Sequence, residues 1–192
     1  MKFPTYFSMS ALIAGSILLS ACSSQSVADS ETKKDENMLV SINWHEPENY
    51  QDVRAPNGGQ HQYQENIFYQ LDKHFQKTAK KFLPEGYTLK LKVTDLNLAG
   101  DARFHQMGHQ NIRLVKSIYF PSMEFEFELF QDGKLVKSDT VKIKDMAFME
   151  RGGLNRFSES LQYEKRLIKD WFDDELSAVV TQWQRHLTAE MS

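Results

Sequence analysis

The sequence predicts an α+β domain with two layers, in which a mixed four-stranded sheet carries two helices on one face in the order β-α-β-β-β-α. The first observation is the alternation of apolar and polar residues in residues 87–94 and 123–129, which is typical of strands with one buried face. The second is the recurrence of apolar residues at helical spacing in residues 67–82 and 161–187. Strands with one apolar face need a cover on one side, and two amphipathic helices supply it.

A long loop connects the first predicted strand to the first helix. Met38 to Trp44 alternates loosely and predicts the strand, and residues 45–60 are rich in turn residues and predict the loop. The helix ends at Leu83-Pro84-Glu85-Gly86, because proline and glycine both oppose its continuation. The next strand runs from Tyr87 to Thr94, and a helix between these two strands predicts that they run parallel.

Asp132-Gly133 predicts the turn of a hairpin that joins residues 123–129 to the segment KLVKSDTVKIKD. A two-residue loop here would pair Glu124 with Val141 and set a charge beside the apolar face. A loop of three residues, beginning one residue earlier, pairs Met123 with Val141 and keeps both apolar sets on one side. We therefore expect the three-residue loop, with Gly133 in the left-handed region. Glutamates of the first strand and lysines of the second then share the solvent face.

One wide apolar stripe predicts a C-terminal helix from about Leu161 to Leu187, with Ser160 as its N-cap. An amphipathic helix on a membrane surface is the alternative, but anionic lipid repels the acidic polar face of this helix. Packing against the sheet is therefore favoured. The acidic residues of the polar face are Asp170, Asp173, Asp174 and Glu175. A solvated face with some pairing four residues apart is also predicted for Glu164, Lys165, Arg166 and Asp170.

The beginning of the chain has the features of a secretory signal peptide. Lys2 is followed by an apolar stretch from Met9 to Leu19 and then by small residues. A transmembrane anchor is the alternative, but it needs about 20 predominantly apolar residues, and this stretch is shorter and broken by serines. We expect residues 1–21 to be the signal peptide, residues 22–37 a flexible polar tether and residues 38–192 one α+β domain.

The segment Leu19-Ser20-Ala21-Cys22 resembles the lipobox of bacterial lipoproteins. The resemblance implies that Cys22, the single cysteine of the sequence, carries diacylglycerol on its sulfur and an N-acyl chain on its new amino group. Two or more acyl chains anchor a protein stably to a membrane. Ser23 and Ser24 follow, where lipoproteins retained in the inner membrane often carry Asp. The resemblance therefore implies the outer membrane, with the domain facing the periplasm, and no cofactor besides this covalent lipid.

Five further segments, spread over nearly the whole predicted domain, carry a second resemblance. They are INWHEPENYQDVR (42–54), LPEGYTLKLKVTDLNLAGD (83–101), YFPSMEFEFEL (119–129), KDMAFM (144–149) and YEKRLIKDWF (163–172). In these segments the chain resembles a family of proteobacterial exported proteins known as domain of unknown function three-thousand-and-sixteen. This resemblance implies one domain, and it brings no activity, substrate or catalytic residue.

His105 and His109 form an H-x-x-x-H pair, which on a helix would place both rings on one face and allow them to bind zinc, with Asp101 as a third ligand. However, Gly108 lies inside the pair, and the glutamate that follows the first histidine of a zinc-protease motif is missing. The segment reads as a polar loop. Solvated loop histidines are therefore favoured over a metal site.

Asp95, Asn97 and Asp101 offer oxygen ligands at the end of a predicted strand, which can suit a hard cation such as calcium. The glycine and distal glutamate of an EF-hand loop are absent. A turn formed by Asp95 and Asn97, with Leu96 and Leu98 in the core, is favoured.

Composition and motifs favour a binding role over catalysis. The net charge is −3 without a Lys/Arg block, so nucleic acid is not expected as a partner. No G-x-S-x-G elbow, G-x-G-x-x-G fingerprint or phosphate loop is present. We expect a binding or accessory module, anchored to the membrane by its lipid, that binds an envelope protein. The expected interaction surface comprises Asp95, Asn97, Asp101 and Arg113, beside the open polar face of the sheet. The alternative is a periplasmic metal-binding protein or metal-dependent enzyme that uses His105 and His109.

Overall fold

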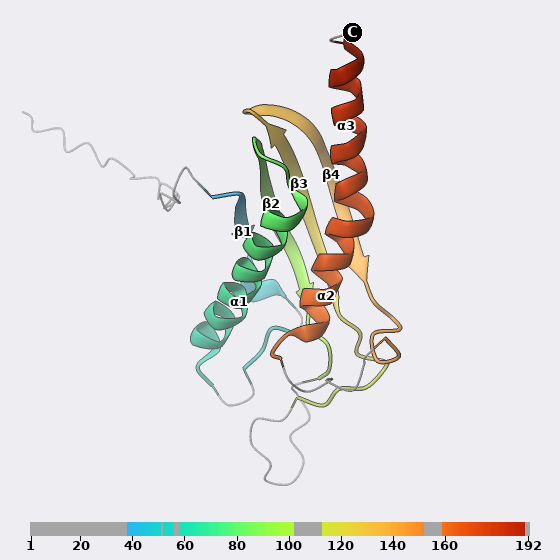
Figure 1. Cartoon of the computed structure of the whole chain (residues 1–192). Helices are drawn as coiled ribbons and strands as arrows, with labels where there is room; N and C mark the ends of the chain where they lie inside the picture. The colour runs from blue at the N-terminus through green and yellow to red at the C-terminus, as the bar shows by residue number, and fades with distance from the viewer. Residues whose placement is uncertain (1–37, 51, 56–57, 102–112, 152–158, 191–192) are drawn as a thin grey trace, which may run out of the picture. The chain divides into compact units, whose positions relative to one another are not determined.

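The computed structural model describes residues 38–50, 52–55, 58–101, 113–151 and 159–190, and it has the predicted order β-α-β-β-β-α (Figure 1). The predicted signal peptide, Cys22 and the tether lie outside the described residues. The elements are β1 (Val40–Trp44), a short 3-10 turn η1 (Pro47–Asn49), α1 (Gln60–Phe82), β2 (Tyr87–Asn97), β3 (Ser122–Gln131), β4 (Lys134–Lys144), α2 (Gln162–Trp171), a π turn η2 (Phe172–Leu176) and α3 (Ser177–Glu190).

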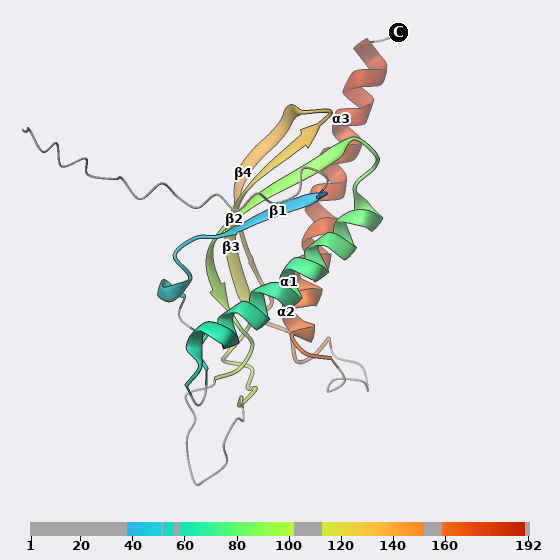
Figure 2. The ribbon, with the colours of Figure 1, turned by 90° about the vertical axis from the view of Figure 1, so that its left-hand side faces the viewer.

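The four strands form one mixed sheet in the order β1-β2-β3-β4. β1 runs parallel to β2, as predicted, and the other two pairs are antiparallel. α1 and the helix formed by α2, η2 and α3 lie on the same side of this sheet (Figure 2). The apolar faces of the strands and helices share one core, in which the ring of Trp171 on α2 meets Phe125 of β3 edge-on at 4.8 Å between centroids. The predicted α+β fold with helices on one face is confirmed.

β2 continues three residues beyond its predicted end. The register with β3 shifts between Val93 and Asp95, so Thr94 is an extra residue that forms a bulge. This extra residue restores the alternation, and Leu96 is buried although it lies three positions after Val93. The prediction that Asp95 and Asn97 close a turn is wrong, because both lie within the strand. The prediction that Leu96 and its neighbour Leu98 belong to the core is confirmed.

The hairpin between β3 and β4 has a loop of two residues, so the predicted three-residue loop is wrong. Asp132 and Gly133 both have positive φ, 47° and 77°, which is the conformation of a type I′ turn. A register shift opposite Leu129 then makes Val136 an extra residue, and the pairing becomes Met123 with Ile143 instead of Val141. The bulge achieves what the longer loop was expected to do, because it returns the apolar residues of both strands to one face.

The predicted C-terminal helix is present, but it runs from Gln162 to Glu190 instead of from Leu161 to Leu187, and its cap and its middle also differ from the prediction. Leu161 occupies the N-cap position with φ 57° and no side-chain cap, so Ser160 does not cap the helix. In η2 the N–H of Ser177 donates to the carbonyl of Phe172, five residues earlier, which widens the helix by one residue. Within the described part of the chain, no helix combines the length and apolar character needed to cross a membrane.

Candidate functional site

The loops at one end of the sheet bring together most of the buried polar groups of the domain. At this end, called the loop end below, β2 and β4 finish, β3 begins, and α1 and α2 start (Figure 1). Of the described residues, the polar or charged ones that are buried are Thr78, Asp101, Asp145 and Glu164, and the last three lie at the loop end. Buried carboxyl groups are costly unless they are bonded, so their partners indicate what this end is built to hold.

Glu164, on the first turn of α2, is 3 % exposed. Its Oε1 accepts a hydrogen bond of 2.7 Å from the backbone N–H of Ala99, which follows β2. Arg113 acts on the other side of the same residue, since its Nε donates to the carbonyl of Ala99 at 2.7 Å. Its Nη2 also donates to the carbonyls of Leu98 at 3.2 Å and Asp52 at 3.3 Å. Three segments that are distant in sequence are thereby joined at Ala99.

Burial raises the pKa of Glu164 above its ordinary range, while the Ala99 N–H and the cation of Arg113 act in the opposite direction. Beside Glu164 lies an open cavity of about 280 Å³. Its polar lining includes Tyr63, Asn66 and Gln70 of α1 together with Arg113 and Glu159. A buried carboxyl with a raised pKa in a cavity that also contains a cation is a common feature of functional sites.

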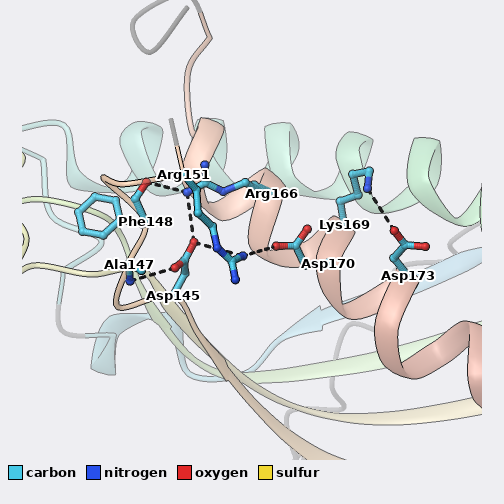
Figure 3. A network of polar contacts seen from close by, with 8 residues as sticks. All are labelled: Asp145, Ala147, Phe148, Arg151, Arg166, Lys169, Asp170 and Asp173. Carbon is cyan, nitrogen blue, oxygen red and sulfur yellow. Dashed lines mark hydrogen bonds and ion pairs between the residues drawn. The ribbon is translucent and has the colours of Figure 1, made fainter. Parts of the chain in front are cut away.

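A second polar network joins Asp145, after β4, to Arg166 of α2 (Figure 3). The Asp145 side chain is 8 % exposed, and its Oδ2 accepts a hydrogen bond of 3.1 Å from Nη2 of Arg166. The same Nη2 donates to the carbonyl of Phe148 at 2.7 Å, and Oδ1 of Asp145 accepts from the N–H of Ala147 at 3.1 Å. This network holds the turn after β4 against α2.

Arg151 closes the network on its exposed side. Its Nη1 lies 3.0 Å from Oδ2 of Asp170 and 3.9 Å from Oδ2 of Asp145 (Figure 3). Lys169 and Asp173 form a separate exposed pair, at 3.5 Å, one turn further along the helix. The network therefore has a pair with a buried carboxylate at one end and an exposed pair at the other.

The structure places the four residues of the expected interaction surface at the loop end, in different surroundings. Asp95 is half-buried, and burial, with a contribution from Glu124, raises the pKa of its carboxyl. The side-chain amide of Asn97 donates to the carbonyl of Phe120 at 3.1 Å. Asp101 is buried, and Arg113 is half-buried with its donors on backbone carbonyls.

His105 and His109 lie outside the described residues, so the expected metal site stays a prediction. In the described ranges, from 38 to 101 and from 113 to 190 with their gaps, no three His, Cys, Asp or Glu side chains come together as a metal site would require. The chain on either side of the histidine segment is joined, because Asp101 and Leu114 exchange two backbone hydrogen bonds of 2.8 and 2.9 Å.

Sequence reasoning missed Glu164 and Arg166, which were expected on a solvated helix face. Glu164 lies three, four and seven residues before Leu167, Ile168 and Trp171, so its position alone places it on the buried face. This spacing could have identified Glu164 as a buried residue, but a charged side chain is usually expected to be exposed. Asp145 could not be singled out, because its partner Arg166 is 21 residues away and the pairing depends on the tertiary fold.

Residues 38–174 match the family described as Protein of unknown function (DUF3016). The match covers well over half of the sequence and includes every buried carboxyl at the loop end. No curated protein and no solved structure matches the chain.

Proposed function

The chain belongs to the DUF3016 family of proteins of unknown function, and we propose that it is a lipid-anchored outer-membrane protein that faces the periplasm and binds another envelope protein without catalysing a reaction. The lipobox-like segment Leu19-Ser20-Ala21-Cys22 supports the anchor and the location. The construction of the loop end supports the binding role. The two parts can be tested separately.

The anchor is tested at Cys22. Growth with an alkyne-labelled fatty acid followed by membrane fractionation should show label on the native chain and its recovery in the outer-membrane fraction. The variant Cys22→Ala removes the sulfur that would carry diacylglycerol, so it should lose the label and the sedimentation with membranes. Ser24→Ala is the matched control and should behave as the native chain does. An unlabelled native chain would contradict the anchor and leave the binding role open.

The observation that carries the binding role is the convergence of Glu164 and Arg113 on a cavity of about 280 Å³ at the loop end. Side chains held by buried hydrogen bonds are preorganised, so a partner that docks there loses little conformational entropy from this surface. Two exposed apolar side chains, Ile118 and Met146, lie at the same end and are 69 % and 63 % exposed. Apolar groups beside satisfied polar groups are typical of protein interfaces.

The binding role is tested by crosslinking in cells with a photoreactive amino acid at Ile118 or at Met146. One discrete partner should be captured from both positions. Leu135, which is 53 % exposed and lies at the opposite end of the hairpin, is the matched control. The same comparison with a soluble form exported by a non-lipoprotein signal shows whether capture requires the anchor. Equal capture from all three positions, or none, would contradict a partner site at the loop end.

Metal binding through His105 and His109, with Asp101, is the second candidate. The backbone hydrogen bonds between Asp101 and Leu114 support it, because they bring together the two ends of the segment that contains both histidines. Purified protein should then bind zinc or calcium in a titration, and the double variant His105→Ala/His109→Ala should not. His61→Ala, at an exposed position on α1, is the control. A native chain that ignores both metals would end this candidate.

A further inference from the structure

A groove runs along β4, between this strand and the helix made of α2, η2 and α3. It consists of two adjoining cavities of about 280 and 370 Å³, which share Lys142, Trp171 and Glu175 in their linings. Its apolar lining includes the buried side chains of Phe127, Trp171 and Leu176. We refer to these two cavities together as the β4 groove. It lies outside the cavity of Glu164 and Arg113.

The strand that borders this groove is an edge of the sheet. Among the described strands, β4 pairs with β3 on one side and with none on the other, so every second residue presents its N–H and C=O outward. β1 forms the other edge of the sheet, and part of its outward backbone already has hydrogen-bond partners. The side-chain amide of Gln76 on α1 accepts from the Val40 N–H at 3.3 Å and donates to the Val40 carbonyl. A side chain of the same domain thus occupies part of the β1 edge.

The π turn η2 adds acidic groups to the β4 groove. Asp174 and Glu175 lie in this turn, line the groove and form no ion pair within the described part of the chain. Trp171, which lines both cavities, has a buried Nε1–H for which the described residues provide no acceptor. π turns often mark functional positions in helices. Here the turn supplies two carboxylates without an ion pair, directly after the residue that carries the unused donor.

The other side of β4 is basic. Lys142 and Lys144 border the groove at the strand edge, but they alternate with the buried Val141 and Ile143, and the Lys142 ammonium pairs with Glu124 of β3 on the polar side of the sheet. An added strand would therefore meet carboxylates on its groove side and lysines on its solvent side. Since side chains of a strand alternate between these two sides, the matching segment alternates basic or apolar residues with acidic ones.

We propose that the β4 groove binds an extended segment of a partner protein by strand addition to β4. The partner's main chain pairs with the outer edge of β4. Its lysine or arginine side chains lie along the apolar lining and reach Asp174 and Glu175, because long cationic side chains bury their stems and keep their charge in water. Its acidic side chains face Lys142 and Lys144. Edge lysines discourage indiscriminate pairing, so this edge selects a partner that neutralises them.

A second copy of this chain fits the groove poorly as the occupant. β4 carries four lysines, Lys134, Lys137, Lys142 and Lys144, against the single acidic residue Asp139. Two such strands side by side would place like charges opposite one another. The inference is independent of the lipid anchor and of the loop end, and it can hold if either part of the proposed function fails.

The test uses the full chain in detergent and a fluorescent peptide of about nine residues, a usual strand length, in which Lys or Val alternates with Glu or Thr. Saturable binding is expected, and hydrogen–deuterium exchange should slow in residues 134–144. The same peptide with alternate amides N-methylated cannot pair with the edge and should not bind. The variant Asp174→Asn/Glu175→Gln should weaken binding about tenfold. Asp173→Asn is the matched control, since Asp173 already pairs with Lys169.

Several outcomes would overturn the proposal. Absence of binding up to about 1 mM peptide would do so, as would equal binding of the N-methylated peptide or binding that leaves exchange in residues 134–144 unchanged. Concentration-dependent self-association that slows exchange in the same residues without peptide would assign the groove to a second copy.

Discussion

Glu164 and Arg113 form hydrogen bonds with the same residue, Ala99, one with its N–H and the other with its carbonyl. The carboxyl of Glu164 accepts the Ala99 N–H and Nε of Arg113 donates to the Ala99 carbonyl, each at 2.7 Å. Because Glu164 lies on α2 and Ala99 follows β2, this arrangement attaches the end of the central strand to the helix that covers it. The carboxyl is buried, so its protonation state influences the stability of the fold.

Replacement of Glu164 by glutamine should change how stability depends on pH. Burial raises the folded-state pKa, so the contribution of the native carboxyl is fully present below its unfolded pKa and is lost as pH rises through the folded pKa. Glutamine keeps an acceptor for the Ala99 N–H and does not titrate. Urea unfolding between about pH 4 and pH 8 should therefore show Glu164→Gln gaining stability relative to the native chain as pH rises. Parallel profiles would contradict the raised pKa.

The alanine variant at the same position separates charge from hydrogen bonding. Glu164→Ala leaves the Ala99 N–H without its acceptor, which should destabilise the fold by about 1–3 kcal/mol. Neither variant titrates at this position, so Glu164→Ala should be less stable than Glu164→Gln by this amount at every pH. A Glu164→Ala variant as stable as Glu164→Gln would show that the hydrogen bond to Ala99 contributes little.

Two of the ion pairs in Figure 3 should differ in their effect on stability. Arg166→Ala removes the nearer cation of the buried Asp145 carboxylate, which then keeps only Arg151 at 3.9 Å and the Ala147 N–H, and it should cost about 1.5–3 kcal/mol. Lys169→Ala removes an exposed partner of Asp173 and should change stability by about 0.5 kcal/mol or less. Chemical denaturation of both variants measures the two changes in the free energy of unfolding.

A double variant controls for the loss of packing. Asp145→Asn/Arg166→Met removes both charges and keeps much of the volume, so it should be more stable than Arg166→Ala. A double variant that is less stable than Arg166→Ala would show that hydrogen bonds to Ala147 and Phe148, and not the charge of Asp145, dominate at this position.

The strands and helices could be predicted because their burial follows a regular period. β3 shows this best: Met123, Phe125, Phe127 and Leu129 are all buried, in agreement with their alternation. The bulges at Thr94 and Val136 were not predicted, since one extra residue changes the parity of a strand and can be recognised only when the partner strand is known. The predicted length of the loop between β3 and β4 was wrong for this reason.

The polar contacts of the loop end depend on distant parts of the chain, which explains why they were not predicted. Ala99 and Glu164 are 65 residues apart, and Asp52 and Arg113 are 61 apart. Periodicity describes which face of a helix is buried, but a carboxyl on that face is expected to be exposed unless its partner is known. Arg113 was included in the expected surface, whereas the role of its donors in joining three loop segments follows from the fold alone.

Gln76 should stabilise the β1 edge through its two hydrogen bonds to Val40. Gln76→Ala removes both and should cost about 1–3 kcal/mol, at about 0.5–1.5 kcal/mol for each bond. Gln76→Glu can still accept from the Val40 N–H but cannot donate to the Val40 carbonyl. Its stability should therefore lie between that of the native chain and that of Gln76→Ala. Gln62→Ala, an exposed position on the same helix, is the control and should be nearly neutral.

Hydrogen exchange gives a second measure of the β1 edge. Loss of the Gln76 amide should speed exchange in residues 39–44 more than in β4, because the edge that it covers becomes open to water. Uniform acceleration over the whole sheet would indicate that Gln76 affects global stability and has no specific effect on the edge.

Two glycines with positive φ should respond differently to alanine. Gly133, in the type I′ turn, has φ 77° and open space where a Cβ would lie, so Gly133→Ala should cost about 1–2 kcal/mol from the left-handed backbone alone. Gly100 has φ 89°, and a Cβ there would lie 2.8 Å from the carbonyl oxygen of Leu114. Because the N–H and the carbonyl of Leu114 both form hydrogen bonds with the backbone of Asp101, Leu114 has little freedom to move away.

Gly100→Ala should therefore be more destabilising than Gly133→Ala, by the cost of displacing the backbone between Asp101 and Leu114. Urea unfolding of both variants measures the difference, and crosslinking from Ile118 shows whether the loop end keeps its shape. Equal destabilisation would mean that the backbone at Leu114 yields easily. In that case the contact between Gly100 and Leu114 would contribute nothing to the rigidity of the loop end.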